Sequence, residues 1–399
     1  MNKTAKNFGA LTPLSTRDSR WNSGFLAELF EKSSHTTRET LKMALWDKDN
    51  SATFENFKTA AKLKEERAIN GFEERYEFEG GTSDWTPRKG KTQAIHQGTS
   101  WSDGDCYKYM EGLSRIYATI EPGSECEEIK LELDSLIKIV TGAQEDDGYL
   151  QTQITIPYRS RWITRLFHED YNLGHLFTAA AVHSEATGET SFINIAKNAA
   201  DNLYDHFIIR QRDAGSFGSN PTHIPGLVDL YRVTGEQRYL ELAIVFLDRR
   251  GSERPLLSET DDRQGPDDQN QMAVAFSDEN EAVGHAVTAG YLYLGASEIY
   301  RVTGDRRLLN TAERIWNDIV DRKLYITGAV GALPVGISKR GFKVWEAFGR
   351  EYQLPHRTAY NETCANITWG MFCRSMFMAT GYPKYADEME RIIYNAGIS

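Results

Sequence analysis

The feature that most constrains the fold is a helix–turn–helix phrase that recurs along the chain. Each copy begins with an apolar stretch, turns at Thr-Gly or a neighbouring glycine, and continues as an amphipathic stretch with apolar residues near i, i+3, i+4 and i+7. Glycine at the turn can adopt the left-handed conformation that ends a helix. Four copies are clear and a fifth is looser; in chain order they occupy residues 106–144 (the looser copy), 174–207, 224–249, 285–321 and 365–397.

The two stretches of each copy differ in where their apolar residues lie. The first is apolar nearly all round and the second carries a charged face, so we expect inner and outer helices respectively. Stacked hairpins of this kind form either an open solenoid or a closed α/α toroid. Long inserts around 250–284 and 322–361 make the spacing uneven, whereas solenoid arrays are usually more regular. We therefore predict an all-α fold, an (α/α)6 toroid.

Five helical pairs are visible, and a six-pair barrel needs one more. Either residues 36–64 supply one helix of this pair, or the pair lies beyond residue 399. The second alternative is suggested because the sequence stops directly after an outer helix. The predicted organisation is an N-terminal extension over residues 1–35 and a barrel catalytic domain over 36–399. We expect this domain to be truncated before its last helices.

Charge and composition exclude several classes of partner. The net charge of −11, with Lys and Arg scattered among acids, argues against nucleic acid and anionic membranes. The sequence contains no run of about 18 apolar residues, so we expect no membrane span. No leader peptide is visible at the N-terminus, which favours the cytoplasm. A neutral or hydrophilic small molecule fits such a surface better, and the sequence makes no prediction of the oligomeric state.

Polar residues gather where the predicted inner helices begin. If these helices run alike, their N-terminal ends share one face, and a carbohydrate site needs such convergent hydrogen-bonding groups. Helix capping is the alternative, because acids are favoured in first turns; it accounts for Asp105 and Glu362 but poorly for histidine, whose protonated form is disfavoured there. The candidates are Asp105, His168, His175, His223, His285, Glu362 and Cys364.

The segment 343–370 adds a carboxylate among apolar neighbours. Glu346 is flanked by Trp345 and lies close to Phe348, so desolvation should raise its pKa, as suits a general acid. Glu362 and Cys364 lie two residues apart and could bind one Zn²⁺. Two ligands alone do not make a zinc site, and a buried cysteine in an apolar helix is the commoner case. The four cysteines form neither a disulfide framework nor a CxxC pair.

An ordered set of motifs resembles glycoside hydrolase family 127, the β-L-arabinofuranosidases and their relatives. The most specific part is WEAF, then YQLP, then YNETCA, at the separations that the family shows. The motifs stand at 345–348, 352–355 and 360–365, with further matches at 55–62 (ENFKTAAK), 102–112 (SDGDCYKYMEG), 147–152 (DGYLQT), 168–176 (HEDYNLGHL) and 278–287 (DENEAVGHAV).

The resemblance implies roles for particular residues. Glu346 would be the general acid/base, Glu362 and Cys364 would ligate zinc, and the histidines at 168, 175, 223 and 285 would contact the sugar. The resemblance implies retaining double displacement, with a zinc-bound cysteine nucleophile in a downstream Cys-Cys or Cys-x-Cys-Cys-Pro segment. The family also has β-sandwich domains at its C-terminal end, and this sequence contains neither that segment nor those domains. We therefore expect the 399-residue chain alone to bind zinc poorly and to hydrolyse no arabinofuranoside.

Two other functions stay open. One is a different α/α-barrel sugar enzyme, an unsaturated glucuronyl hydrolase or an epimerase, which needs no thiol. The other is a carbohydrate-binding remnant that is catalytically incomplete. Within the family, the substrate could be L-arabinofuranose or an unusual branched acid of plant pectin.

Overall fold

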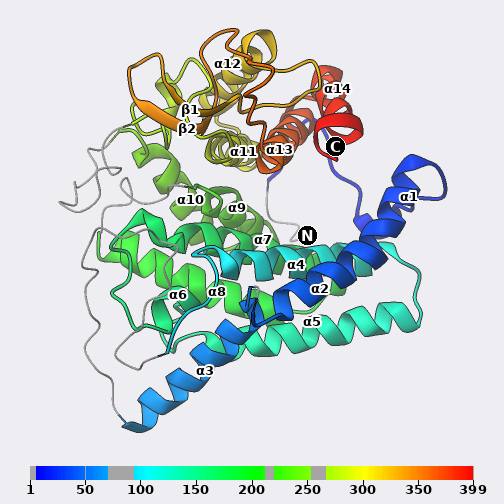
Figure 1. Ribbon diagram of the computed structural model, residues 1–399, viewed down its shortest axis with the longest axis vertical. Helices are drawn as coiled ribbons and strands as arrows, with labels where there is room; N and C mark the ends of the chain where they lie inside the picture. Colours follow the sequence, from blue (N-terminus) through cyan, green and yellow to red (C-terminus); the bar gives the residue numbers. More distant parts are fainter. Residues whose placement is uncertain (1–5, 50, 71–93, 212–219, 253–266, 399) are drawn as a thin grey trace. The chain divides into compact units, whose positions relative to one another are not determined.

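The computed structural model describes residues 6–49, 51–70, 94–211, 220–252 and 267–398 (Figure 1). Parts of the predicted N-terminal extension (1–5) and of the first insert (253–266) lie outside the described residues. The chain divides into two compact units. Residues 14–210 form the N-terminal unit, and residues 211–399 with the segment 2–13 form the C-terminal unit.

The N-terminal unit contains two of the predicted hairpins, preceded by three helices. These three are α1 (Phe25–Lys32), α2 (Arg38–Trp46) and α3 (Thr53–Asn70), and α3 packs along α5. The region 36–64 was predicted to hold one helix, but both α2 and α3 begin within it. The hairpins are α4 (Ser102–Thr119) with α5 (Ser124–Ala143), and α7 (Glu169–Thr187) with α8 (Ser191–Tyr204); the short α6 (Thr152–Thr155) lies between them in sequence.

The C-terminal unit contains the other three hairpins and a two-stranded sheet. The hairpins are α9 (His223–Thr234) with α10 (Gln237–Arg249), α11 (Ala286–Thr303) with α12 (Arg306–Arg322), and α13 (Thr363–Thr380) with α14 (Pro383–Arg391). Strands β1 (Leu333–Ile337) and β2 (Lys343–Ala347) pair antiparallel, with Leu333 opposite Ala347. All five predicted helical pairs are confirmed. The sheet, inside the second long insert, was not predicted.

The inner and outer assignment is confirmed by burial. In α11, 16 of 18 residues are buried, whereas only one face of α12 is. Small residues let the inner helices approach: a Cβ at Gly290 would lie 2.3 Å from Thr368 of α13, and one at Gly295 would lie 2.7 Å from Ile224 of α9. Close packing of this kind fixes α11 between its two neighbours.

The all-α prediction is confirmed, and closure into a toroid, which concerns both units together, stays a prediction. So does the boundary at residue 36. Part of the predicted extension pairs with the C-terminal unit, where Phe8 N donates to Arg301 O (2.8 Å) and Ala10 N to Ala379 O (3.1 Å). Among the described residues, no helix is long and apolar enough to cross a membrane.

The turn glycines have the predicted left-handed backbone. Gly188, Gly235, Gly304 and Gly381 have φ of 80°, 76°, 76° and 75°, and each follows the last residue of an inner helix. Each glycine N–H donates to the carbonyl four residues back, at 2.7–2.8 Å. These bonds pair carbonyl groups that the helix end would otherwise leave without a partner.

Replacing these glycines should separate conformational strain from steric clash. Gly188→Ala should lower the free energy of unfolding by about 1–2 kcal/mol, because alanine is strained in the left-handed backbone conformation. No steric clash adds to this cost, because no neighbouring atom lies within 4 Å of the new Cβ. Gly304→Ala should cost more, because its Cβ would lie 2.8 Å from the Phe8 ring. Urea denaturation measures both.

Gly112 is the matched control, inside α4 with open space around its Cβ. Gly112→Ala should stabilise the protein by up to about 1 kcal/mol, through helix propensity. Equal effects for the two turn variants would contradict the packing of Phe8 on Gly304.

Candidate active site

Glu346 lies on β2 in a left-handed backbone conformation, with φ of 50°. Its side chain is 41% exposed and is held by two donors from other segments. The Tyr360 hydroxyl donates to Oε1 at 2.7 Å, and Nε2 of His285 lies 3.1 Å from Oε2. A strained backbone at a residue that can take part in a reaction is typical of functional sites.

His285 is the residue before α11 and caps that helix. Its Nδ1 accepts the backbone N–H of Val287 at 3.2 Å, so Nδ1 carries no proton and Nε2–H is the donor to Glu346. The expectation that capping explains histidine poorly is wrong for this residue. A neutral imidazole accepts a helix N–H as a serine or aspartate would, and only the protonated form is disfavoured.

The predicted rise in the pKa of Glu346 is wrong. Hydrogen bonding from His285 lowers the pKa below its ordinary value, the Tyr360 hydroxyl adds to this effect, and desolvation opposes it. Two hydrogen-bond donors therefore outweigh the desolvation that the apolar neighbours were expected to cause. The surroundings of Glu346 come instead from α11 and from the segment before α13, and they favour the carboxylate.

Glu362 joins the same cluster from the N-terminal end of α13. The ligand atoms of His285, Glu346 and Glu362 all lie within 4.8 Å of one another. Cys364 is exposed in the first turn of α13. Burial and the hydrogen bond to Glu346 raise the pKa of Tyr360, with smaller contributions from Glu362 and Cys364. Three predicted site residues therefore meet, with Cys364 near Tyr360.

Gln269 was missed by the sequence analysis, and it holds both Glu346 and His285 in place. Its side-chain oxygen accepts Trp345 N at 2.7 Å, and its amide donates to Trp345 O at 3.3 Å. Its own carbonyl accepts His285 N at 2.9 Å. One residue thus links the strand of Glu346 to the cap of α11. A lone glutamine in a polar insert gave no signal in the sequence.

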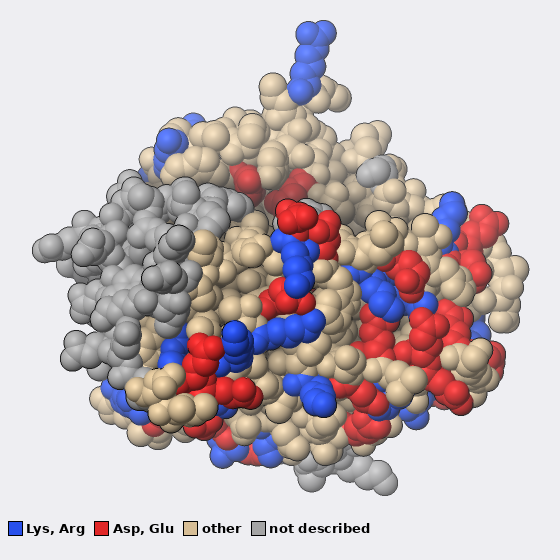
Figure 2. Space-filling view, turned by 60° about the horizontal axis from the view of Figure 1, so that its bottom comes forward, with Lys and Arg blue, Asp and Glu red and all other residues tan. Residues whose placement is uncertain are grey.

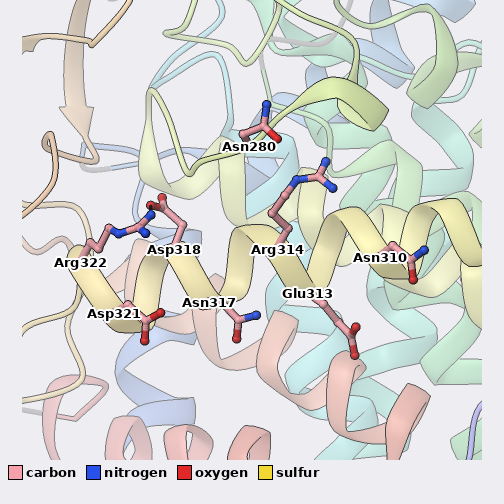
Figure 3. Close-up of a pocket in the computed structure, with 8 residues that line it drawn as sticks. All are labelled: Asn280, Asn310, Glu313, Arg314, Asn317, Asp318, Asp321 and Arg322. Atoms are coloured by element: carbon pink, nitrogen blue, oxygen red, sulfur yellow. Dashed lines mark hydrogen bonds and ion pairs between the residues drawn. The ribbon is translucent and has the colours of Figure 1, made fainter.

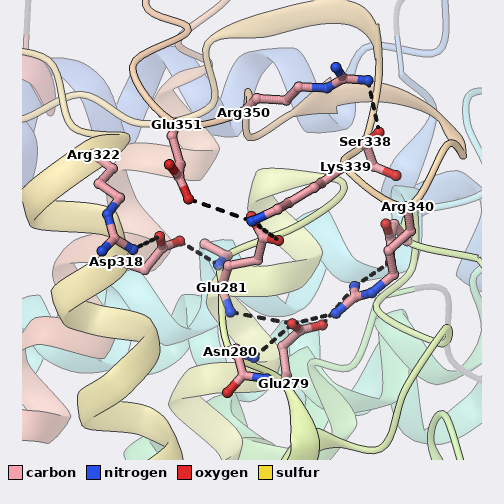
Figure 4. A network of polar contacts seen from close by, with 12 residues as sticks. Glu279, Asn280, Glu281, Asp318, Arg322, Ser338, Lys339, Arg340, Arg350 and Glu351 are labelled. Carbon is pink, nitrogen blue, oxygen red and sulfur yellow. Dashed lines mark hydrogen bonds and ion pairs between the residues drawn. The ribbon is translucent and has the colours of Figure 1, made fainter.

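Ion pairs support the segments around the site, and Figure 4 shows the contact of Arg340 with Glu279. Arg340, from the turn between the strands, binds the buried Asp268 and also Glu279, both at 2.7 Å. Lys323 binds Glu281 (2.9 Å) and Asp318 (3.0 Å) at the end of α12. The acids of the DENE phrase therefore support the site without lying at its centre.

Three further predicted residues lie together in the N-terminal unit. His168 has φ of 52° directly before α7, and its Nδ1 lies 2.8 Å from Leu166 O and 3.0 Å from Ser100 Oγ. His175 is buried in the second turn of α7, its ring 4.7 Å from that of Tyr171. Asp105, in the first turn of α4, pairs with Lys108 at 2.8 Å. Their sugar contacts stay predictions.

His223 lies inside its own hairpin. The ring is fully buried, 4.3 Å from the Phe246 ring of α10. Burial lowers the pKa of His223 to about 3, with a smaller contribution from Arg250. Its contact with a sugar stays a prediction.

A polar hollow runs along the exposed side of α12 (Figure 3). None of the predicted site residues lines it, and both of its arginines already have partners: Arg314 donates to Glu279 O (2.7 Å), and Arg322 binds Asp318 (3.2 Å). We therefore do not assign the chemistry to this hollow.

Comparison with known proteins defines the class. The chain belongs to the glycoside hydrolase family 127 catalytic domain of β-L-arabinofuranosidases, whose family model matches residues 20–399. It is 32% identical over 323 residues to a non-reducing end β-L-arabinofuranosidase of Bifidobacterium longum, covering 76% of this chain and 46% of that protein.

Solved structures agree with this assignment. A family 127 β-L-arabinofuranosidase from Geobacillus stearothermophilus T6 has a TM-score of 0.77 at 28% identity, covering 94% of this chain and 55% of that one. Another family 127 β-arabinofuranosidase has a TM-score of 0.74 at 30% identity, covering 97% and 54%. This chain spans about half the length of these relatives.

Burial of His223 as a neutral ring has a consequence for acid stability. Its folded pKa of about 3 lies below the ordinary 6.5, so its contribution to stability is present above pH 6.5 and is lost as pH falls towards 3. Between pH 7 and pH 5 this one group should cost about 2 kcal/mol of unfolding free energy. In His223→Gln, the fall in stability measured by urea denaturation should be smaller by that amount.

His356→Gln is the control, because His356 is exposed. It should keep the wild-type dependence on pH. Identical pH slopes for the wild type and His223→Gln would rule out a buried neutral ring at position 223.

Proposed function

We propose that this chain is the catalytic part of a retaining glycoside hydrolase that removes terminal β-L-arabinofuranose. One observation carries the proposal: in a family 127 catalytic domain, Glu346 meets His285 and Glu362 with all ligand atoms within 4.8 Å. The relatives named above are β-L-arabinofuranosidases. In this proposal the substrate is a carbohydrate, and the nucleophile is a cysteine thiolate outside the 399 residues.

Glu346 would transfer the proton at the glycosidic oxygen. A retaining reaction needs one group that first donates this proton and later takes one from water. The two donors on its carboxylate favour the base form, which suits the second step. A sugar hydroxyl that accepts the His285 Nε2–H would withdraw the larger of these two effects and raise the pKa of Glu346, which suits the first step.

The donor set fits a zinc ion in chemistry. Glu362 offers a carboxylate at the N-terminal end of α13, and Cys364 offers a thiol two residues later. Of these two predicted ligands, Glu362 belongs to the group of described residues within 4.8 Å, whose other members are His285 and Glu346. Further cysteine ligands would come from outside this chain. Bound zinc would lower the pKa of a coordinating thiol.

Replacement of Glu346 tests the proposal. In a polypeptide that carries these 399 residues and the further cysteines, Glu346→Gln should lower kcat on an aryl β-L-arabinofuranoside by about 10²–10⁴, the usual contribution of general acid–base catalysis. Glutamine keeps the size of the side chain and an oxygen to accept from Tyr360. Glu351→Gln, at an exposed residue nearby, is the control and should retain activity. A loss below tenfold for Glu346→Gln would sink its assignment.

Replacement of Cys364 separates zinc chemistry from the other barrel sugar enzymes. Cys364→Ala should lower both bound zinc, measured by metal analysis, and kcat, because a thiolate ligand is lost. Cys126→Ala is the matched control at a cysteine outside the cluster. If Cys364→Ala keeps full zinc content and full activity, the chain works without this thiol and an alternative barrel enzyme replaces the proposal.

A further inference from the structure

A buried glutamine, Gln271, contacts the backbone around His285. It is 5% exposed and belongs to the insert before α11, in a turn where its N–H donates to Asp268 O at 3.2 Å. Its backbone is left-handed, with φ of 54°. A residue with a side chain is strained in this conformation, so the surrounding contacts must hold Gln271 there.

The side-chain amide of Gln271 binds three carbonyl groups around His285. Its Nε2 donates to Val283 O at 2.9 Å, to Gln269 O at 3.2 Å and to His285 O at 3.4 Å. The carbonyl of Gln269 is also the acceptor of the His285 backbone N–H. One buried amide therefore connects the chain before His285, His285 itself and the segment that holds β2.

Thr288, in the first turn of α11, holds the oxygen of the same amide. Its hydroxyl lies 3.0 Å from Gln271 Oε1 and 2.9 Å from His285 O. Both ends of the Gln271 amide thus have partners in the buried interior. The amide cannot rotate without leaving buried polar groups unpaired, so the backbone around His285 has one preferred position.

Gly284 allows the segments to approach this closely. It has φ of 70°, and a Cβ at this position would overlap Asp268 O and lie 2.7 Å from Gln269 O. Its own carbonyl accepts Phe348 N, directly after β2, at 2.9 Å. The backbone before His285 is therefore packed against the insert and bonded to the end of the strand that carries the carboxylate.

A shift of His285 would reach Glu346 directly. The imidazole is held between two partners, with Nδ1 accepting from Val287 N and Nε2 lying 3.1 Å from the Glu346 carboxylate. That carboxylate is 41% exposed, so it depends on its hydrogen-bond donors to keep its position. Proton transfer needs the carboxyl group within hydrogen-bond reach of the reacting oxygen, and a small misplacement is costly.

We propose that Gln271 is a positioning residue for proton transfer by Glu346: its amide fixes the backbone of His285, and His285 fixes the carboxylate. The inference rests on the proposed function, in which Glu346 protonates the leaving oxygen. It predicts an effect that depends on the leaving group, because a poor leaving group needs the proton and an activated one needs it much less. A purely structural role would lower activity on both kinds of substrate alike.

Kinetics on two substrates test the role of Gln271. The protein is the polypeptide that carries these 399 residues and the further cysteines, and the substrates are methyl and para-nitrophenyl β-L-arabinofuranoside. Gln271→Met keeps the length of the side chain and removes the amide. It should lower kcat/KM for the methyl glycoside by about 10²-fold, and for the nitrophenyl glycoside by about tenfold less.

Gln144→Met is the matched control. Gln144 carries a buried amide of the N-terminal unit, 7% exposed, which donates to Gly148 O and Ile195 O, both at 2.9 Å. Both methionine variants should lose a similar free energy of unfolding in urea, because each leaves buried carbonyl groups without this donor. Gln144→Met should nevertheless keep the wild-type ratio of the two kcat/KM values.

Thr288→Val covers the case in which Gln271→Met does not fold. Valine keeps the branched shape of threonine and removes the hydroxyl that holds Gln271 Oε1, so the ratio should change several-fold in the same direction. A wild-type ratio in folded Gln271→Met, or in Thr288→Val where Gln271→Met does not fold, would overturn the positioning role.

Glu346→Gln, measured on the same two substrates, distinguishes failure of this inference from failure of the proposed function. It should change the ratio more than Gln271→Met does, because it removes the proton donor itself. If Glu346→Gln leaves the ratio at the wild-type value, the acid/base assignment fails and the role of Gln271 falls with it. If Glu346→Gln changes the ratio and Gln271→Met does not, the role of Gln271 alone is wrong.

Discussion

The chemistry of Glu346 depends on one hydrogen bond at a helix start. The first N–H groups of α11 need acceptors, and Nδ1 of His285 accepts one of them from Val287. This bond requires an unprotonated Nδ1, so the proton of the neutral ring must sit on Nε2, where it reaches Glu346 at 3.1 Å. A demand of the helix backbone thereby sets the hydrogen-bond donor of a carboxylate 61 residues later in the chain.

The same backbone logic gives His168 the opposite tautomer. Its Nδ1 meets a carbonyl, that of Leu166, so the proton stays on Nδ1 and Nε2 accepts. The neutral rings therefore differ at Nε2, which is a donor in His285 and an acceptor in His168. Residue type alone cannot distinguish these roles, because the partner of the first ring nitrogen decides the character of the second.

The helices could be predicted from the sequence because their signals are local. Apolar periodicity identified five pairs, and glycine at each turn marked where four of the inner helices end, as the φ of Gly188, Gly235, Gly304 and Gly381 confirms. The meeting of His285, Glu346 and Glu362 could be anticipated only through the family motifs, since no local rule brings residues from three segments to one point. The strands at 333–347 escaped prediction because they are short and lie within an insert.

The sequence could not show which residues surround each side chain of the site. Trp345 adjoins Glu346 in sequence, which suggested a raised pKa, but the hydrogen bonds from His285 and Tyr360 outweigh desolvation and lower the pKa of Glu346.

Gln269 makes the same point from the other side, because its side-chain amide bonds the backbone N–H and carbonyl of Trp345, groups that every residue type other than proline carries. The side chain of Gln269 holds the strand next to Glu346, whose backbone is left-handed, and its carbonyl accepts the N–H of His285, which caps α11. The position of the carboxylate is therefore determined by an insert that shows no periodic pattern. Its acids act indirectly: Arg340, between β1 and β2, binds Asp268 and Glu279 and so keeps the segment of Gln269 beside β2.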